Sequence, residues 1–132
     1  MTRAELTTVR RLWIEIIQQE EYLIGLRGLL WSMERSLKAG RSNVTGRKVE
    51  RMVLKILDEK ERLQWLYERL DGAKKRLRAQ IEDEVEDMTL RRLLILRYVE
   101  RQTWTQISEG LDKSRREIYR MHKKFASQLD AH

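Results

Sequence analysis

From Thr103 to Leu129 the chain reads TWTQISEGLDKSRREIYRMHKKFASQL, and two helix starts follow each other closely in this stretch. A capping box pairs a hydroxyl with an acid or amide side chain three residues later, and each of the two satisfies a backbone amide at the start of a helix. Thr103 and Gln106 have this spacing. Ser114 and Glu117 have the same spacing. The stretch therefore predicts two helices separated by only a few residues.

These two helices are expected to form a helix-turn-helix. We place the first at residues 104–111 and the second at residues 115–129, with a tight turn of residues 111–113 between them. In units of this kind the second helix enters the major groove of DNA. The apolar residues that should set the angle between the helices are Ile107, Leu111, Ile118, Met121, Phe125 and Leu129.

Basic side chains gather on the second of these helices. Residues 113–124 contain six Lys or Arg and one acid, and the whole chain has 28 Lys plus Arg against 21 Asp plus Glu, a net charge of +7. A basic helix suggests a polyanion partner, although a solvated helix face accounts for the charge equally well. We expect the arginines and Tyr119 to contact base edges and the lysines to contact phosphates. The predicted DNA-contacting residues are Lys113, Ser114, Arg115, Arg116, Tyr119, Arg120, Lys123 and Lys124.

Apolar residues recur every seven positions earlier in the chain, a spacing typical of coiled-coil helices. One series is Val9, Ile16, Leu23, Leu30 and Leu37, and the other is Val49, Ile56, Leu63, Leu70 and Leu77. The turn-forming sequence GRSNVTG lies between them. The two series pair in reverse order, which predicts an antiparallel hairpin. The expected fold class is all-α, with helices at about 5–39 and 47–82 in a hairpin domain of residues 1–86, followed by the helix-turn-helix domain of residues 87–132.

The first hairpin helix carries more apolar surface than one partner helix can cover. A second stripe beside the seam consists of Trp13, Ile17, Ile24 and Trp31. Large apolar patches of this kind are usually covered by another surface. We expect a homodimer through the N-terminal hairpin, and the alternative is that the stripe packs within the chain, for example against the C-terminal helices.

The residues that enzymes and metal sites require are scarce. The chain has no Cys, and its two histidines form no HExxH or ExxH pair, while the P-loop and GxGxxG patterns are absent. We therefore expect no catalytic residues, no metal site, no cofactor and no enzyme activity, and we expect His122 to be a groove-facing or partly exposed polar residue. Apolar runs are far shorter than the roughly 20 residues of a spanning helix. We expect no membrane partner and no secretion signal.

The stretch from residue 94 to residue 129 resembles the region-four helix-turn-helix of bacterial sigma factors. It resembles still more the C-terminal half of small phage proteins of Gram-positive bacteria that are related to the ArpU and RinA late transcriptional regulators. The matching motifs are Leu96-Arg97-Tyr98, Trp104, Ser114-Arg115-Arg116 and Tyr119 to Lys124, with a looser match at Val49 to Ile56. Two positions depart from the family pattern. Asp112 stands where Gly is usual in the turn, and Phe125-Ala126 replaces Ala-Leu.

The resemblance and the basic helix together predict a phage or prophage transcriptional regulator that binds double-stranded DNA. Such a protein would be cytoplasmic in a bacterial host and associated with the nucleoid. One alternative is an interaction module that docks on RNA polymerase or another regulator, because fold alone does not decide function. Another is a DNA-packaging protein of the small-terminase kind, which also joins a helix-turn-helix to an oligomerising hairpin.

Overall fold

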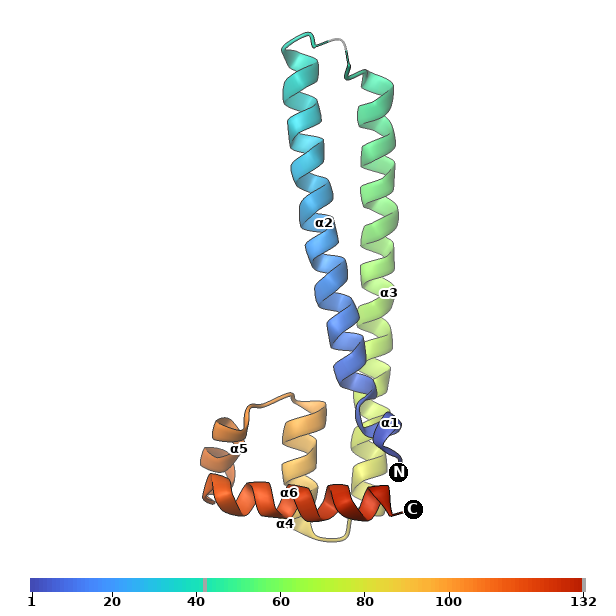
Figure 1. Ribbon diagram of the computed structural model, residues 1–132. Coiled ribbons are helices and arrows are strands. Elements are labelled where there is room, and N and C mark those ends of the chain that lie inside the picture. Colours follow the sequence, from blue (N-terminus) through green and yellow to red (C-terminus); the bar gives the residue numbers. More distant parts are fainter. Residues whose placement is uncertain (42, 132) are drawn as a thin grey trace. The chain divides into compact units, whose positions relative to one another are not determined.

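The computed structural model of the protein describes residues 1–41 and 43–131, and these residues form helices and no strand. The helical elements in order are α1 (Arg3–Leu6), α2 (Thr8–Lys38), α3 (Gly46–Glu84), α4 (Met88–Leu94), the π-helical turn η1 (Ile95–Val99), α5 (Trp104–Leu111) and α6 (Arg115–Asp130) (Figure 1). The all-α class is therefore confirmed. None of the described helices has the length and apolar character that a membrane crossing needs.

The chain divides into two compact units, and the division does not fall at residue 86 as expected. One unit is the hairpin segment Trp13–Arg69, and the other combines residues 1–12 with the chain from Leu70 onward. The second unit includes the first turns of α2 and the last turns of α3. Val9 and Ile81 are fully buried there, as is Leu93 of α4. Burial of these apolar side chains in one core explains why this part of the hairpin belongs with the C-terminal helices.

In the hairpin unit, α2 and α3 run antiparallel and bury the predicted seam. Leu23, Leu26 and Ile56 form a buried cluster, against which Leu30, Met52 and Leu63 pack. The cluster contains two of the pairs expected from the heptad spacing, residue 23 with 63 and residue 30 with 56. Leu37 departs from the expected pattern, because its side chain is 41% exposed near the end of α2. The seam is thus closed in the middle of this unit and open near its loop.

Polar contacts also join the two hairpin helices. The buried amide of Gln19 donates to the backbone carbonyl of Glu59 over 3.0 Å and to its carboxylate over 2.6 Å. The Tyr67 hydroxyl donates to Glu20. The edge of Trp13 meets the Tyr67 ring at a centroid distance of 6.4 Å. These contacts fix the register of α2 against α3, because a buried polar group must keep its partner.

The second unit begins with a separate helical turn rather than with one continuous helix. Thr2 caps α1 in a reciprocal box with Glu5, and the helix ends at Thr7 before α2 begins. The guanidinium of Arg3 makes two contacts with the Asp130 carboxylate, at 3.1 and 2.7 Å. The ends of the described chain in this unit therefore lie side by side. The helix expected to start at about residue 5 starts at Arg3 instead, and it is interrupted at Thr7.

Helix α4 passes directly into a wider helical turn. It ends at Leu94, and the chain continues as the π-helical turn η1 at Ile95–Val99, where the helical stretch stops. The amide of Glu100 donates to the carbonyl of Ile95, five residues earlier, over 2.9 Å. The backbone of the next residue, Arg101, lies in the left-handed region at φ 56°. A left-handed residue cannot continue a right-handed helix, so the chain leaves the helix axis at this point.

The helix-turn-helix has the predicted bounds within one residue. Thr103 and Gln106 form the complete capping box, whereas Ser114 accepts from the Glu117 amide over 3.2 Å without the reciprocal bond to its own amide. Asp112 occupies the left-handed region at φ 52°, ψ 46° and so ends α5. Helices α4, α5 and α6 pack against one another around fully buried Ile107 and Ile118.

Candidate nucleic-acid interface

The exposed side of α6 carries most of the residues predicted to contact DNA. Arg115, Arg116, Tyr119, Arg120, Lys123 and Lys124 are all exposed, and we call these six residues the α6 basic face. Ser114 is exposed at the N-cap, where its hydroxyl is engaged by the Glu117 amide. Lys113 is half-buried and lies 3.9 Å from the Glu117 carboxylate. These last two residues belong to the turn and start of the helix rather than to its open side.

Helical periodicity separates the α6 basic face from the core. Successive residues turn by about 100°, so positions three and four apart share a side. Ile118 and Phe125 point inward and are buried, which leaves Tyr119, with 62% of its surface exposed, on the outer side. A shallow hollow there is lined by Trp104, Arg115, Arg116, Tyr119, Arg120 and Lys123. The structure therefore brings five of the predicted contact residues around one concave surface.

Trp104 supports this surface from α5. Its ring meets the Tyr119 ring edge-on at a centroid distance of 6.3 Å, and the Arg97 guanidinium lies 4.3 Å from its centroid on another side. Arg115 also reaches back to the Thr105 hydroxyl, at 3.5 Å. Aromatic and cation–π contacts of these kinds contribute about 0.5–2 kcal/mol each. The contacts of Trp104 with Tyr119 and of Arg115 with Thr105 join α5 to α6 and restrict how far α6 can turn.

The positive charge of the α6 basic face is largely free of ion pairs. Among the described residues, no carboxylate lies within 4.0 Å of the charged groups of the five Lys and Arg residues on this face. The nearby pair between Lys113 and Glu117 is solvent-exposed and weak. Unpaired cations on one side of a helix attract phosphates strongly, because each contact releases a counterion.

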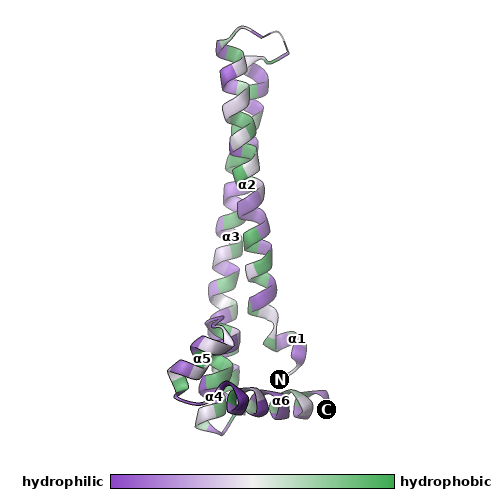
Figure 2. Cartoon of the chain, turned by 60° about the vertical axis from the view of Figure 1, so that its left-hand side comes forward, coloured by the Kyte–Doolittle hydropathy of each residue, from purple (hydrophilic) through white to green (hydrophobic). Residues whose placement is uncertain are grey.

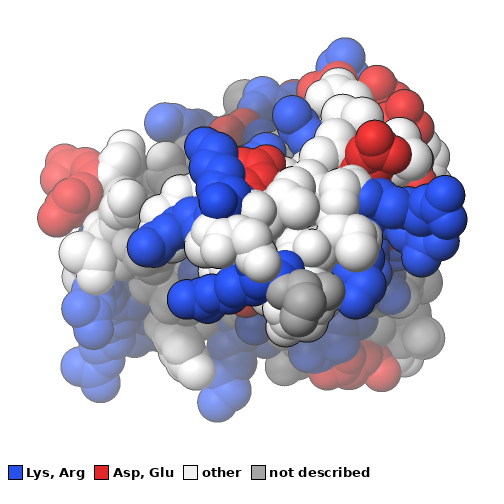
Figure 3. Space-filling view, turned by 90° about the horizontal axis from the view of Figure 1, so that it is seen from above, with Lys and Arg blue, Asp and Glu red and all other residues white. Residues whose placement is uncertain are grey.

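Charge alone does not distinguish this face from others. Figure 3 looks onto the loop end of the hairpin unit and shows Lys and Arg side chains spread over several parts of that surface as well. What sets α6 apart is the arrangement of its cations on a capped helix that follows a short helix and a left-handed turn. This geometry, rather than the net charge, identifies the candidate interface.

His122 was expected to be groove-facing or partly exposed, and it is partly exposed on a side of α6 away from the α6 basic face. It is half-buried, its ring stacks on Tyr98 at a centroid distance of 5.7 Å and an angle of 24°, and its Nε2 shares a hydrogen bond with the Tyr98 hydroxyl. Burial, reinforced by the charges of Arg97 and Arg3, holds the pKa of His122 below its ordinary value. The neutral imidazole is therefore favoured.

Three of the four residues in the predicted dimer stripe remain exposed. Ile17 is 42%, Ile24 67% and Trp31 61% exposed, whereas Trp13 is half-buried beside Tyr67 of its own hairpin. Figure 2 shows apolar residues along both hairpin helices, interleaved with polar ones. Further exposed apolar residues lie on α3 and were not predicted, and among them Leu54, Leu57 and Trp65 are 62%, 50% and 49% exposed. Their positions beside the heptad seam could have revealed them.

No group of three or more His, Asp or Glu residues within the described part of the chain is arranged to hold a metal ion. Comparison of the chain with protein-family models, with curated proteins and with solved structures found no match. The resemblance of residues 94–129 to sigma region four and to the phage regulators thus stays a prediction from the motifs quoted above. Any functional conclusion depends on the site itself.

Proposed function

We propose that this protein is a phage or prophage transcriptional regulator that binds double-stranded DNA through α6 in the major groove. The observation that carries the proposal is the α6 basic face, a set of cations with no ion pair to any described residue, on one side of a capped helix that follows a left-handed turn. In this arrangement the residues nearest the helix start reach base edges, and those further along meet phosphates. Arg116 and Arg120 would then read bases, and Lys124 would bind the backbone.

The first experiment is selection of random DNA duplexes by the full chain at moderate salt, with the molecular mass measured on the same sample. A single enriched motif is expected, because arginine contacts to guanine discriminate by roughly 1–3 kcal/mol per base pair. Absence of any enriched motif would reject sequence-specific binding. In that case, binding to RNA polymerase would favour the docking alternative, and a ring-sized mass would favour the packaging alternative.

Two variants separate base reading from phosphate binding. Arg116→Ala should relax the preference at one position of the selected site, with a loss of about fivefold or more for the best sequence. Lys124→Ala should weaken binding to all sequences alike and lower the salt slope by about 1. Arg92→Ala is the matched control, because Arg92 is exposed on α4 and lies outside the α6 basic face. Unchanged binding by both test variants would reject the assignment of α6.

The proposed regulator acts as a homodimer through the hairpin unit. The exposed apolar residues Ile17, Ile24 and Trp31 on α2 support this, since single-chain burial leaves them in contact with water. A second copy of the hairpin would cover them in a four-helix arrangement. A dimer would also place two copies of α6 on DNA, and the selected site should then be a palindrome with half-sites about one helical turn apart.

A further inference from the structure

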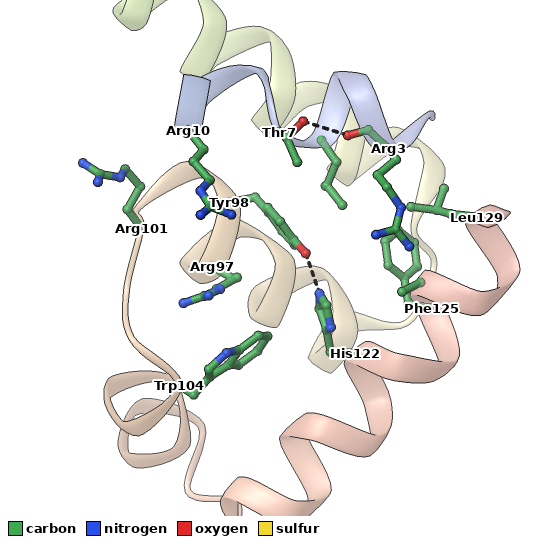
Figure 4. Close-up of a pocket in the computed structure, with 12 residues that line it drawn as sticks. Arg3, Thr7, Arg10, Arg97, Tyr98, Arg101, Trp104, His122, Phe125 and Leu129 are labelled. Carbon is green, nitrogen blue, oxygen red and sulfur yellow. Dashed lines mark hydrogen bonds between the residues drawn. The ribbon is translucent and has the colours of Figure 1, made fainter. Parts of the chain in front are cut away.

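A second positively charged site lies on the inner side of α6, away from the α6 basic face. It is a cavity of about 400 Å³ lined by parts of the chain that are far apart in sequence. Arg3 and Arg10 come from the N-terminal segment, Arg97 and Tyr98 come from η1, and His122 comes from α6 (Figure 4). A cavity of this size lies within the range of small-molecule sites, about 300–1,000 Å³.

The cavity has a surplus of positive charge. Four arginines line it, at positions 3, 10, 97 and 101, and none of the described lining residues is acidic. Arg3 is neutralised in part by its two contacts with Asp130. Arg10 and Arg97 have no carboxylate within 4.0 Å among the described residues. Two guanidinium groups without counter-charges, held in one concave site, favour an anionic ligand.

Arg97 has structural contacts of its own but keeps donors that a ligand could use. Arg97 is held in place by its contact with Trp104 and by donation from its Nη1 to the carbonyl of Gln102 over 3.1 Å. A guanidinium has five donors, so several remain available. Arg10 extends from α2 toward Tyr98 (Figure 4). The charges of Arg97, Arg3 and Arg10 all act on the Tyr98 hydroxyl, where they oppose the rise in its pKa that burial causes.

The rest of the lining is aromatic and apolar. Tyr98, Trp104 and Phe125 contribute rings, and Leu6 and Leu129 contribute aliphatic walls. An inorganic ion would use the arginines but would not cover the apolar walls of Leu6, Phe125 and Leu129. A molecule that joins a phosphate to a flat ring would use both, because guanidinium groups match phosphate oxygens and aromatic side chains pack well against bases.

We propose that this cavity binds a phosphorylated ligand of nucleotide size, with Arg10 and Arg97 as the phosphate ligands. The uncharged part of the ligand lies against Leu6 and Phe125. The phosphate has two possible sources, a free nucleotide or a nucleotide of bound DNA. The site does not include the α6 basic face, so it stands apart from the proposed reading of the major groove.

The probe is AMP, with adenosine and inorganic phosphate as comparisons, titrated into the full chain while the ring signals of His122 are followed by NMR. AMP should shift these signals, and adenosine should bind at least about tenfold more weakly because it lacks the phosphate. Arg10→Gln and Arg97→Gln should each weaken AMP binding by about tenfold or more. Arg97→Lys keeps the charge but not the planar fork, and should bind AMP with intermediate affinity. Backbone spectra of each variant report whether the fold is kept.

Arg92→Gln is the matched control, since it removes one exposed arginine of the same unit outside the cavity. It should leave AMP binding unchanged, as should Lys124→Ala on the α6 basic face. If AMP does not bind but both cavity variants weaken binding to a DNA duplex, the phosphate belongs to DNA. The proposal is overturned if millimolar AMP leaves the His122 signals in place and the cavity variants bind DNA normally, or if those variants bind AMP as well as the unmodified chain does.

Discussion

Substitution of Asp112 tests the geometry of the turn that positions α6. Asp112 is exposed, and its backbone lies in the left-handed region at φ 52°, ψ 46°. This conformation brings Cβ close to the following carbonyl oxygen and costs an ordinary residue roughly 1–2 kcal/mol, although Asp and Asn tolerate it better than most. Gly has no Cβ and avoids that cost. It loses more backbone conformational entropy on folding, however, which costs about 0.5–1 kcal/mol relative to Ala.

These opposing effects predict an order of stability within a set of three variants. Asp112→Ala should lower the free energy of unfolding of this unit by about 1 kcal/mol. Asp112→Gly should remain within about 0.5 kcal/mol of the unmodified chain, because the relief of strain and the added entropy nearly cancel. Asp112→Asn removes the charge and keeps the tolerance for this conformation. It is therefore the control for electrostatic effects.

Amide hydrogen exchange at Ile107 and Ile118 measures the effect locally. The two amides donate to the carbonyls of Thr103 and Ser114 over 3.0 and 3.1 Å, at the starts of α5 and α6. A loss of about 1 kcal/mol corresponds to exchange about fivefold faster. Equal exchange rates in the Ala and Gly variants would show that the left-handed turn does not limit the stability of this unit. A rate change in the Asn variant as large as that in the Ala variant would assign the effect to charge instead.

Two further predictions concern pH and assembly. Burial holds the pKa of His122 in the folded chain below the ordinary value of about 6.5, so His122 binds a proton more readily in the unfolded chain. The free energy of unfolding should therefore fall as the pH drops below about 6.5 toward the pKa of the folded state. His122→Phe should reduce this dependence in urea titrations at neutral and mildly acidic pH, and an unaltered pH profile would contradict it. Ile24→Glu should convert the proposed dimer to a monomer, as measured by light scattering. It should have little effect on folding, since Ile24 is 67% exposed. Gln18→Glu, an exposed change on another side of α2, should keep the dimer, and a dimer that survives Ile24→Glu would place the interface elsewhere.

Local signals predicted the ends of some helices well. Thr103 and Ser114 marked the starts of α5 and α6, because a cap acts on amides within three residues of itself. The heptad spacing also predicted the pairing of Leu23 with Leu63. The π-helical turn at Ile95–Val99 was not predicted, because the sequence ILRYV contains no Gly or Pro that would mark a change in the helix.

The candidate interface and the cavity differ in how far the sequence could reveal them. Residues of the α6 basic face lie within ten positions of one another, so helical periodicity alone placed them on one side. Arg10 and Arg97 are far apart in sequence and belong to different helical elements. Nothing in the spacing of arginines along the chain indicated that these two would share a cavity. For His122 the sequence left a groove-facing and a partly exposed position open, and the contacts of its ring with Tyr98 and Trp104 give it the second.

Local patterns in the chain were enough to predict the all-α class, the antiparallel hairpin, the two capped helices and the outward side of α6. Each depends on interactions between residues a few positions apart, or on a repeat that continues along a helix. Long-range packing brings residues 1–12 together with the C-terminal helices, and it places an arginine of α2 and one of η1 in the lining of the same cavity as Tyr98. The physical reason is that these contacts join distant segments, whose meeting depends on the packing of the whole unit rather than on local backbone preference.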